Sequence, residues 1–222
     1  PYEWKDVKVN IIDAPGFFDF YGEVTAAMAM SDSALIVVGA VSGPVVGTEK
    51  AMDMCKKSGK PRMIVINKMD RENANFVKAM NTVAEAMDTR LVPVQIPWGE
   101  AADFKGVIDL FSMKAYQEGG KVVDIPADLQ SQAEEANLEL IEAAAEGSEA
   151  LMEKYFDAGT LTAEEIMQGL SMGVQSGDFI PVFCSSATQE IGMTPLLDAI
   201  LKLMASPADR PAKIAQGVAG EE

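Results

Sequence analysis

The chain contains several short apolar runs, and the clearest of them are followed by polar segments. Residues 63–66 are apolar and mostly β-branched, and they lie between Pro61 and the polar sequence Asn67-Lys68-Met69-Asp70. Such a run is typical of a strand that is buried on both faces of a parallel sheet. Other runs predict an edge strand within residues 2–8 and sheet strands at 7–13, 35–40, 91–96 and 179–184.

Helices are predicted between these strands. Residues 76–87 carry apolar side chains at a spacing of three to four, namely Phe76, Val77, Met80, Val83 and Met87. The other predicted helices are 20–30, 49–58, 127–145 with Pro126 at its first turn, 162–174 opened by a Thr162–Glu165 capping box, and 194–205 with Thr194 as cap and Pro195 in first position. This alternation predicts an α/β fold with a mostly parallel sheet.

The pattern changes between residues 99 and 176. Three short runs at 107–111, 113–117 and 121–125 are separated by turns and predict antiparallel strands, and the two helices at 127–145 and 162–174 follow them. We interpret 99–176 as an inserted α+β subdomain in a core formed by 1–98 and 177–206. Residues 207–222 are interpreted as a linker toward a further domain.

The insert also carries most of the charge of the chain. It holds 16 Asp and Glu against four Lys, a net charge of −12 out of −16. A solvated face and a partner-binding face both explain this acidity. So acidic a chain is not expected to bind nucleic acid by itself. The two cysteines suggest a reducing cytoplasm, and no apolar stretch is long enough to cross a membrane.

Three polar segments follow predicted strands, at the edge where α/β sheets bind ligands. They are Asp13-Ala14-Pro15-Gly16, Asn67-Lys68-Met69-Asp70 and Ser185-Ser186-Ala187. A carboxylate such as that of Asp70 can accept two N–H bonds from the edge of guanine, and the stem of Lys68 can lie on a purine ring. The sequence therefore predicts a guanine-nucleotide site at this edge.

These motifs, in this order, resemble those of GTP-binding proteins. The sequence Asp13-Ala14-Pro15-Gly16-Phe17-Phe18-Asp19-Phe20 is similar to the Asp-Thr-Pro-Gly-His-Val-Asp-Phe of translational GTPases. The sequences at 67–71, 74–76, 124–128 and 151–155 resemble bacterial elongation factor G and its paralogues. The resemblance implies that the chain contacts GTP or GDP, that Asp13 reaches Mg²⁺ through water, that Gly16 meets the γ-phosphate and that Ser185, Ser186 and Ala187 contact the guanine oxygen.

The resemblance also implies a P-loop GTPase fold, a GTP-hydrolysing parent protein, a role on the ribosome and cytoplasmic localisation. It further implies that the insert binds the ribosomal stalk protein. The chain has no Gly-x-x-x-x-Gly-Lys-Ser/Thr sequence, and the glycine-rich residues 39–47 do not supply that order. We expect the P-loop and its strand to precede Pro1, so this piece alone should be inactive and bind no nucleotide.

Phe17 departs from the family, which has a histidine that positions the attacking water. A phenyl ring has no hydrogen-bond donor or acceptor and cannot orient water. Three interpretations follow: a translocation-type GTPase in which another group assists hydrolysis, a divergent ribosome-protection or regulatory paralogue that hydrolyses GTP poorly, and a stalk-binding module for which nucleotide is dispensable.

Overall fold

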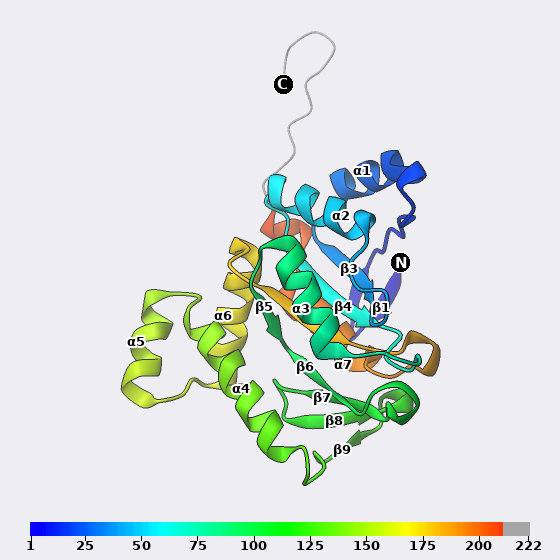
Figure 1. Ribbon diagram of the computed structural model, residues 1–222. Helices are drawn as coiled ribbons and strands as arrows, with labels where there is room; N and C mark the ends of the chain where they lie inside the picture. Colours follow the sequence, from blue (N-terminus) through cyan, green and yellow to red (C-terminus); the bar gives the residue numbers. More distant parts are fainter. Residues whose placement is uncertain (211–222) are drawn as a thin grey trace.

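A four-stranded parallel sheet forms the centre of the protein (Figure 1). The structure is a computed structural model that describes residues 1–210. The strands follow the order β3 (Ala34–Gly39), β4 (Arg62–Asn67), β10 (Ile180–Cys184) and β5 (Leu91–Pro93), and each neighbouring pair is parallel. The sheet confirms the predicted α/β fold, and its carboxyl ends place the polar segments that follow β4 and β10 side by side.

Helices cover both faces of this sheet. Successive residues of β4 point to opposite faces, and because both sets are apolar, both faces must be buried. Ile64 and Ile66 are buried in a core with the helices α2 (Val46–Lys57) and α3 (Phe76–Met87). Met63 and Val65 are buried in a second core with the helices α4 (Gln130–Ala145), α6 (Ala163–Ser176) and α7 (Met193–Leu203). The helix α1 (Tyr21–Met30) lies beside α2 (Figure 1). The result is a three-layer arrangement.

A second sheet is antiparallel and is formed within residues 95–123. It has the order β6 (Gln95–Trp98), β7 (Gly106–Asp109), β8 (Lys114–Gln117) and β9 (Val122–Val123). Side chains from this sheet and from α4, including Ile108 and Leu140, share one core with Met63 and Phe183 of the parallel sheet. This region therefore completes one face of the central sheet. The helix α5 (Glu149–Ala158) joins α4 to α6 in the chain and lies outside both of them, away from the sheets (Figure 1).

The strand predicted at 7–13 forms only at residues 7–9, and it does not enter the central sheet. Residues 10–13 form no strand, and β2 (Val7–Val9) pairs with β1 (Tyr2–Trp4) in a hairpin of its own. The turn residues Lys5 and Asp6 both have positive φ, of 49° and 63°. The hairpin is attached to α7, since Trp4 Nε1 and Lys5 Nζ donate to the carboxylate of Asp198 at 2.7 and 2.8 Å. The hydrogen-bonding partner of β2 is therefore its neighbour β1. Within residues 1–210, no strand lies between β2 and β3 to join the hairpin to the central sheet.

The predicted strand at 91–96 is divided between the two sheets. The segment β5 pairs with β10, whereas β6 pairs with β7. Val94 stands between them: its N–H donates to the Val182 carbonyl and its carbonyl accepts from Leu110 N–H. Hydrophobic periodicity does not distinguish one continuous strand from two short strands that meet at a shared residue.

Two helix starts differ from their predictions. Gly192 precedes α7 in the left-handed conformation, with φ of 81°, so Thr194 is not the cap. Helix α4 begins at Gln130, beyond Pro126. The capping box of α6 is confirmed, while α5, capped by Ser148 and ended by Gly159, was not predicted.

The short 3₁₀ helices are Phe18–Phe20, Ala101–Asp103, Glu118–Gly120, Ala187–Gln189 and Pro207–Asp209. Most of the predicted linker, 211–222, lies outside the described residues.

Candidate functional site

The carboxyl ends of β4 and β10 hold two of the three predicted polar segments together. In the parallel register Cys184 lies opposite Ile66, so the loops that follow leave the sheet next to each other. Asn67 connects them: its Oδ1 accepts from Ala187 N–H at 3.0 Å and from Ser185 Oγ at 3.2 Å. The same oxygen accepts from Lys68 N–H at 2.7 Å. Asn67 therefore fixes the loops and leaves its amide nitrogen available.

Asp70 is held by the second loop. Ser186 Oγ donates to Asp70 Oδ1 at 2.7 Å, and Ser186 itself is fully buried. The other oxygen, Oδ2, lies 3.9 Å from Arg71 Nε. Between these residues Met69 is fully buried, and its N–H donates to the Ser185 carbonyl at 3.1 Å. The carboxylate is therefore oriented by the protein before any ligand arrives.

This arrangement suits a ligand edge that carries adjacent N–H donors. Guanine presents N1–H and its 2-amino group side by side, and an ionised carboxylate is an acceptor for both. Adenine presents an unprotonated ring nitrogen at the corresponding place, so the carboxylate disfavours it. Lys68 lies in the left-handed conformation, with φ of 65°, and its side chain is exposed beside the same loop. The residues present therefore fit a guanine base.

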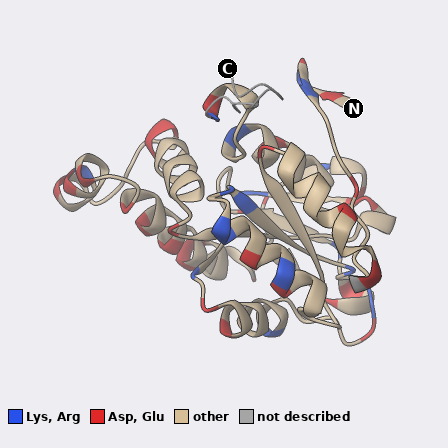
Figure 2. Cartoon of the chain, turned by 90° about the horizontal axis from the view of Figure 1, so that it is seen from above, with Lys and Arg blue, Asp and Glu red and all other residues tan. Residues whose placement is uncertain are grey.

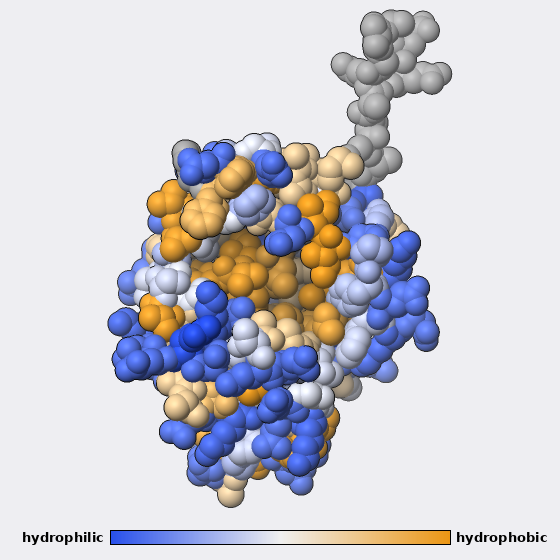
Figure 3. Space-filling view, turned by 90° about the vertical axis from the view of Figure 1, so that its right-hand side faces the viewer, coloured by the Kyte–Doolittle hydropathy of each residue, from blue (hydrophilic) through white to orange (hydrophobic). Residues whose placement is uncertain are grey.

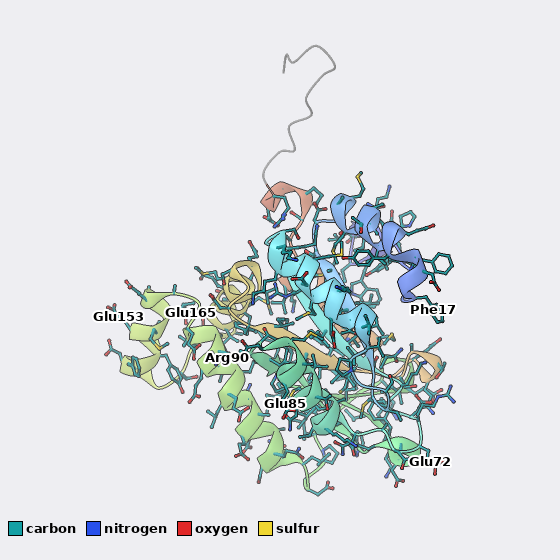
Figure 4. The ribbon with its side chains drawn as sticks, turned by 45° about the horizontal axis from the view of Figure 1, so that its top comes forward. Phe17, Glu72, Glu85, Arg90, Glu153 and Glu165 are labelled. Atoms are coloured by element: carbon teal, nitrogen blue, oxygen red, sulfur yellow. The ribbon has the colours of Figure 1, made fainter. Side chains whose placement is uncertain are left out.

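The loop at 13–17 lies apart from these two. Asp13, Gly16 and Phe17 are exposed, while Ala14 and Pro15 are half-buried. The loop packs against the start of α2, because a side chain at Gly47 would meet the Gly16 carbonyl at 2.7 Å. Phe17 is 75% exposed and points outward (Figure 4). Within residues 1–210, no hydrogen bond joins residues 13–17 to the segments 67–70 and 185–187.

We refer to residues 68–75, which connect β4 to α3 and include Asp70, as the base-reading loop. A cavity of about 210 Å³ lies beside it. The cavity is bordered by Val37 and Gly39 of β3, by Ser42 in the loop before α2, by Thr48 in the first turn of α2, and by Asn67 and Lys68. Leu35 and Val37, on one face of β3, are exposed, as are Ile11 and Ile12, and within residues 1–210 β3 pairs only with β4 in the parallel sheet. The face that carries the N-terminal hairpin is hollowed and apolar at its centre (Figure 3). In the described part of the chain, the edge of β3 is therefore open.

Asp13 is the predicted contact to Mg²⁺. Within the described residues, no group of three or more His, Cys, Asp or Glu side chains is positioned to hold a metal ion. Magnesium in nucleotide sites is typically held by one or two carboxylates together with waters and phosphates. A single exposed carboxylate therefore fits a metal ion that arrives with the nucleotide.

One residue of the site was missed in the sequence. Glu100 lies across from the base-reading loop, where its Oε1 accepts from Phe76 N–H at 2.9 Å and its Oε2 accepts from Asn75 Nδ2 at 3.0 Å. Sequence spacing gives no signal for this contact, because Glu100 caps a helix that begins 24 residues earlier. Its neighbour Gly99 requires the left-handed backbone, with φ of 81°.

Comparison with known proteins agrees with this geometry. Residues 1–206 match the family of the elongation factor Tu GTP binding domain. The fold is similar to that in the crystal structure of the protein ttk003000868 from Thermus thermophilus, with a TM-score of 0.86 and 31% sequence identity. The match covers 94% of this chain and 32% of that one, so the chain spans about a third of the length of this relative. None of the helices within residues 1–210 has the length and hydrophobicity of a membrane span.

The family match over residues 1–206 and the structural match together show that the chain belongs to the elongation factor Tu GTP-binding domain family. It carries a GTP-binding domain of the translational GTPases.

Proposed function

We propose that this chain is part of a cytoplasmic, GTP-driven translation elongation factor of the translocation type, which acts on the ribosome. The observation that carries the proposal is the paired loop arrangement in which Ser186 orients Asp70 and Asn67 joins the two loops. In this proposal Asp70 reads the guanine edge, Lys68 covers the ring, and the backbone of Ser185, Ser186 and Ala187 faces the guanine oxygen. The test is ribosome-stimulated GTP turnover by the full-length protein.

The phosphate half of the site is proposed to lie between residues 13–17 and β3. Asp13 would hold Mg²⁺ through water, and the Gly16 N–H would meet the γ-phosphate, next to Ala14 and Pro15. The bound metal would neutralise charge on the phosphates. The open edge of β3, with Leu35 and Val37 exposed, offers a place for a strand that carries the P-loop. We propose that such a strand comes from a segment preceding Pro1.

A second candidate function is supported by Phe17. A divergent ribosome-protection or regulatory paralogue would bind GTP and hydrolyse it slowly, because the exposed phenyl ring offers no group that orders water. We expect Phe17→His in the full-length protein to raise ribosome-stimulated turnover by about 10²-fold or more, since such groups typically contribute about 10²–10⁴-fold. Single-turnover GTP hydrolysis measures this directly.

Phe20→His is the matched control, since Phe20 is a half-exposed phenylalanine three residues further on. It should leave turnover unchanged. Wild-type turnover as fast as that of the Phe17→His variant would show that another group assists hydrolysis, and would favour the first function.

The acidic region 99–176 is proposed to be an inserted subdomain that binds the ribosomal stalk protein. Acidic side chains are spread along its helices with few cations among them (Figure 2). On α5, Phe156 is 76% exposed and Glu153 points outward (Figure 4). An exposed aromatic side chain beside carboxylates suits a partner with an apolar pocket and a basic rim.

Because this region shares a core with the central sheet, deleting it would expose buried side chains such as Met63 and Phe183. A point substitution is the sharper test. We expect Phe156→Ala to weaken binding of the stalk protein by about tenfold or more, since burying such a side chain is worth about 1.5–3 kcal/mol. Isothermal titration against the stalk protein's C-terminal domain gives the affinity.

Val77→Ala on α3 is the control, since Val77 is also an exposed apolar residue, at 54%, on another helix. It should bind the stalk protein as the wild type does. Equal affinities for the wild type and the Phe156→Ala variant would place the partner site elsewhere.

A further inference from the structure

The segment at the start of the acidic region touches the base-reading loop at two points. Its first contact is the carboxylate of Glu100, which accepts from Phe76 N–H and from Asn75 Nδ2. Both donors lie at the beginning of α3, where the first N–H groups of a helix have no partner within the helix. A carboxylate there also faces the positive end of the helix dipole. Glu100 therefore fixes the end of the loop that enters α3.

The second contact is made by the backbone of the next residue. Ala101 N–H donates to the Met69 carbonyl at 2.9 Å, while Met69 N–H donates to the Ser185 carbonyl at 3.1 Å. Met69 is completely buried, and these two bonds hold the peptide group before it and the peptide group after it. Asp70 follows Met69 directly, and the contact from Ala101 therefore fixes the backbone from which the Asp70 side chain extends.

The loop between these two contacts is short and internally bonded. Arg71 N–H donates to the Lys68 carbonyl and Ala74 N–H donates to the Arg71 carbonyl, at 3.1 and 3.0 Å. Lys68 and Asn73 have positive φ, of 65° and 63°. A loop with this little freedom transmits a displacement at Asn75 or Met69 to the residue between them. Asp70 therefore depends on the position of both ends.

We propose that residues 99–101 clamp the base-reading loop, and that Glu100 is a positioning residue for Asp70 in guanine recognition. The proposal rests on the proposed role of Asp70 and extends it to a residue outside the recognised motifs. Gly99 makes the clamp possible, because its φ is 81° and a side chain there would meet the Asp103 carbonyl at 2.0 Å. The clamp also links the acidic region to the nucleotide site, since Trp98, just before Gly99, pairs with Gly106 in the second sheet.

The test compares GDP with inosine diphosphate, which lacks the 2-amino group of guanine, on the full-length protein. We expect the wild type to prefer GDP. In the Glu100→Ala variant we expect this preference to fall by about tenfold, which corresponds to about 1.4 kcal/mol. Inosine diphosphate keeps N1–H, so its binding should weaken as well, but less than that of GDP, which loses contacts from both N–H groups. A general loss of stability would weaken both nucleotides equally, so the ratio of the two affinities separates positioning from folding.

Two variants complete the design. Glu165→Ala removes the carboxylate that caps α6, at 2.9 Å from Thr162 N–H, and should leave the ratio unchanged. Glu100→Gln keeps an acceptor for Phe76 N–H but loses the one for Asn75 Nδ2, so it should give an intermediate ratio. This milder variant provides the test if Glu100→Ala does not fold. A wild-type preference that both Glu100 variants retain would overturn the clamp alone. A wild type that does not prefer GDP would overturn the role of Asp70, and the clamp with it.

Discussion

The isolated 222-residue chain is expected to bind neither GTP nor GDP with useful affinity, although Asn67, Lys68 and Asp70 are in place. Base contacts supply specificity, whereas the phosphates supply most of the affinity in sites of this kind. In the family the P-loop gives several N–H bonds, a lysine and a metal ligand to the phosphates. Hydrogen bonds to charged groups are worth about 1.5–3 kcal/mol each, so four of them contribute about 6–12 kcal/mol.

Each 1.4 kcal/mol changes an affinity about tenfold, so a nanomolar site without these contacts would fall to tens of micromolar or weaker. Titration of a fluorescent GDP analogue measures this. The full-length protein is the control and should bind the analogue tightly. Saturable binding by the isolated chain below about 10 µM would mean that a described loop holds phosphate.

The loop at 39–47 is the place where such binding would occur, because it borders the cavity next to Asn67. Its backbone is already engaged, since Gly43 N–H donates to the Gly39 carbonyl at 2.9 Å. Thr48 is buried and its Oγ1 accepts from Val45 N–H. The N–H groups of Gly43 and Val45 are therefore already engaged and are not available to an anion.

The strands β4 and β10 and the loops after them could be predicted from the sequence for a simple reason. Both strands are buried on both faces, which requires continuous apolar runs, and each run ends where polar side chains begin. Parallel pairing then brings the two loops to the same edge. The structure brings Asn67, Asp70 and Ser186 together at the edge that the pattern predicts. That these three residues bind the nucleotide stays a prediction that rests on the resemblance.

The strand at 7–13 could not be placed in the same way. Its pattern is that of a strand, but a strand also needs a partner, and a sequence run does not name one. Residues 7–9 pair with residues 2–4 through a tight turn at Lys5 and Asp6. Glu100 was missed for a related reason, since a carboxylate that caps a helix from another part of the chain leaves no periodic signal.

Asp70→Asn in the full-length protein is expected to shift the preference from GTP toward xanthosine triphosphate. Ser186 Oγ donates to Oδ1 of Asp70 at 2.7 Å, and this bond should select the oxygen of an amide for the same place. The amide nitrogen would then occupy the position of Oδ2. There it is a donor, which clashes with the guanine N–H groups and suits the 2-oxo group of xanthine.

Two hydrogen bonds to a charged acceptor are lost for GTP, which is about 3–6 kcal/mol, or roughly 10²–10⁴-fold in affinity. Glu72→Gln is the matched control, because Glu72 is exposed in the same loop and the change removes the same unit of charge (Figure 4). It should keep the preference for GTP. Competition between the two nucleotides on each variant gives the ratio directly. An Asp70→Asn protein that still selects GTP as the wild type does would show that Asp70 does not read the base.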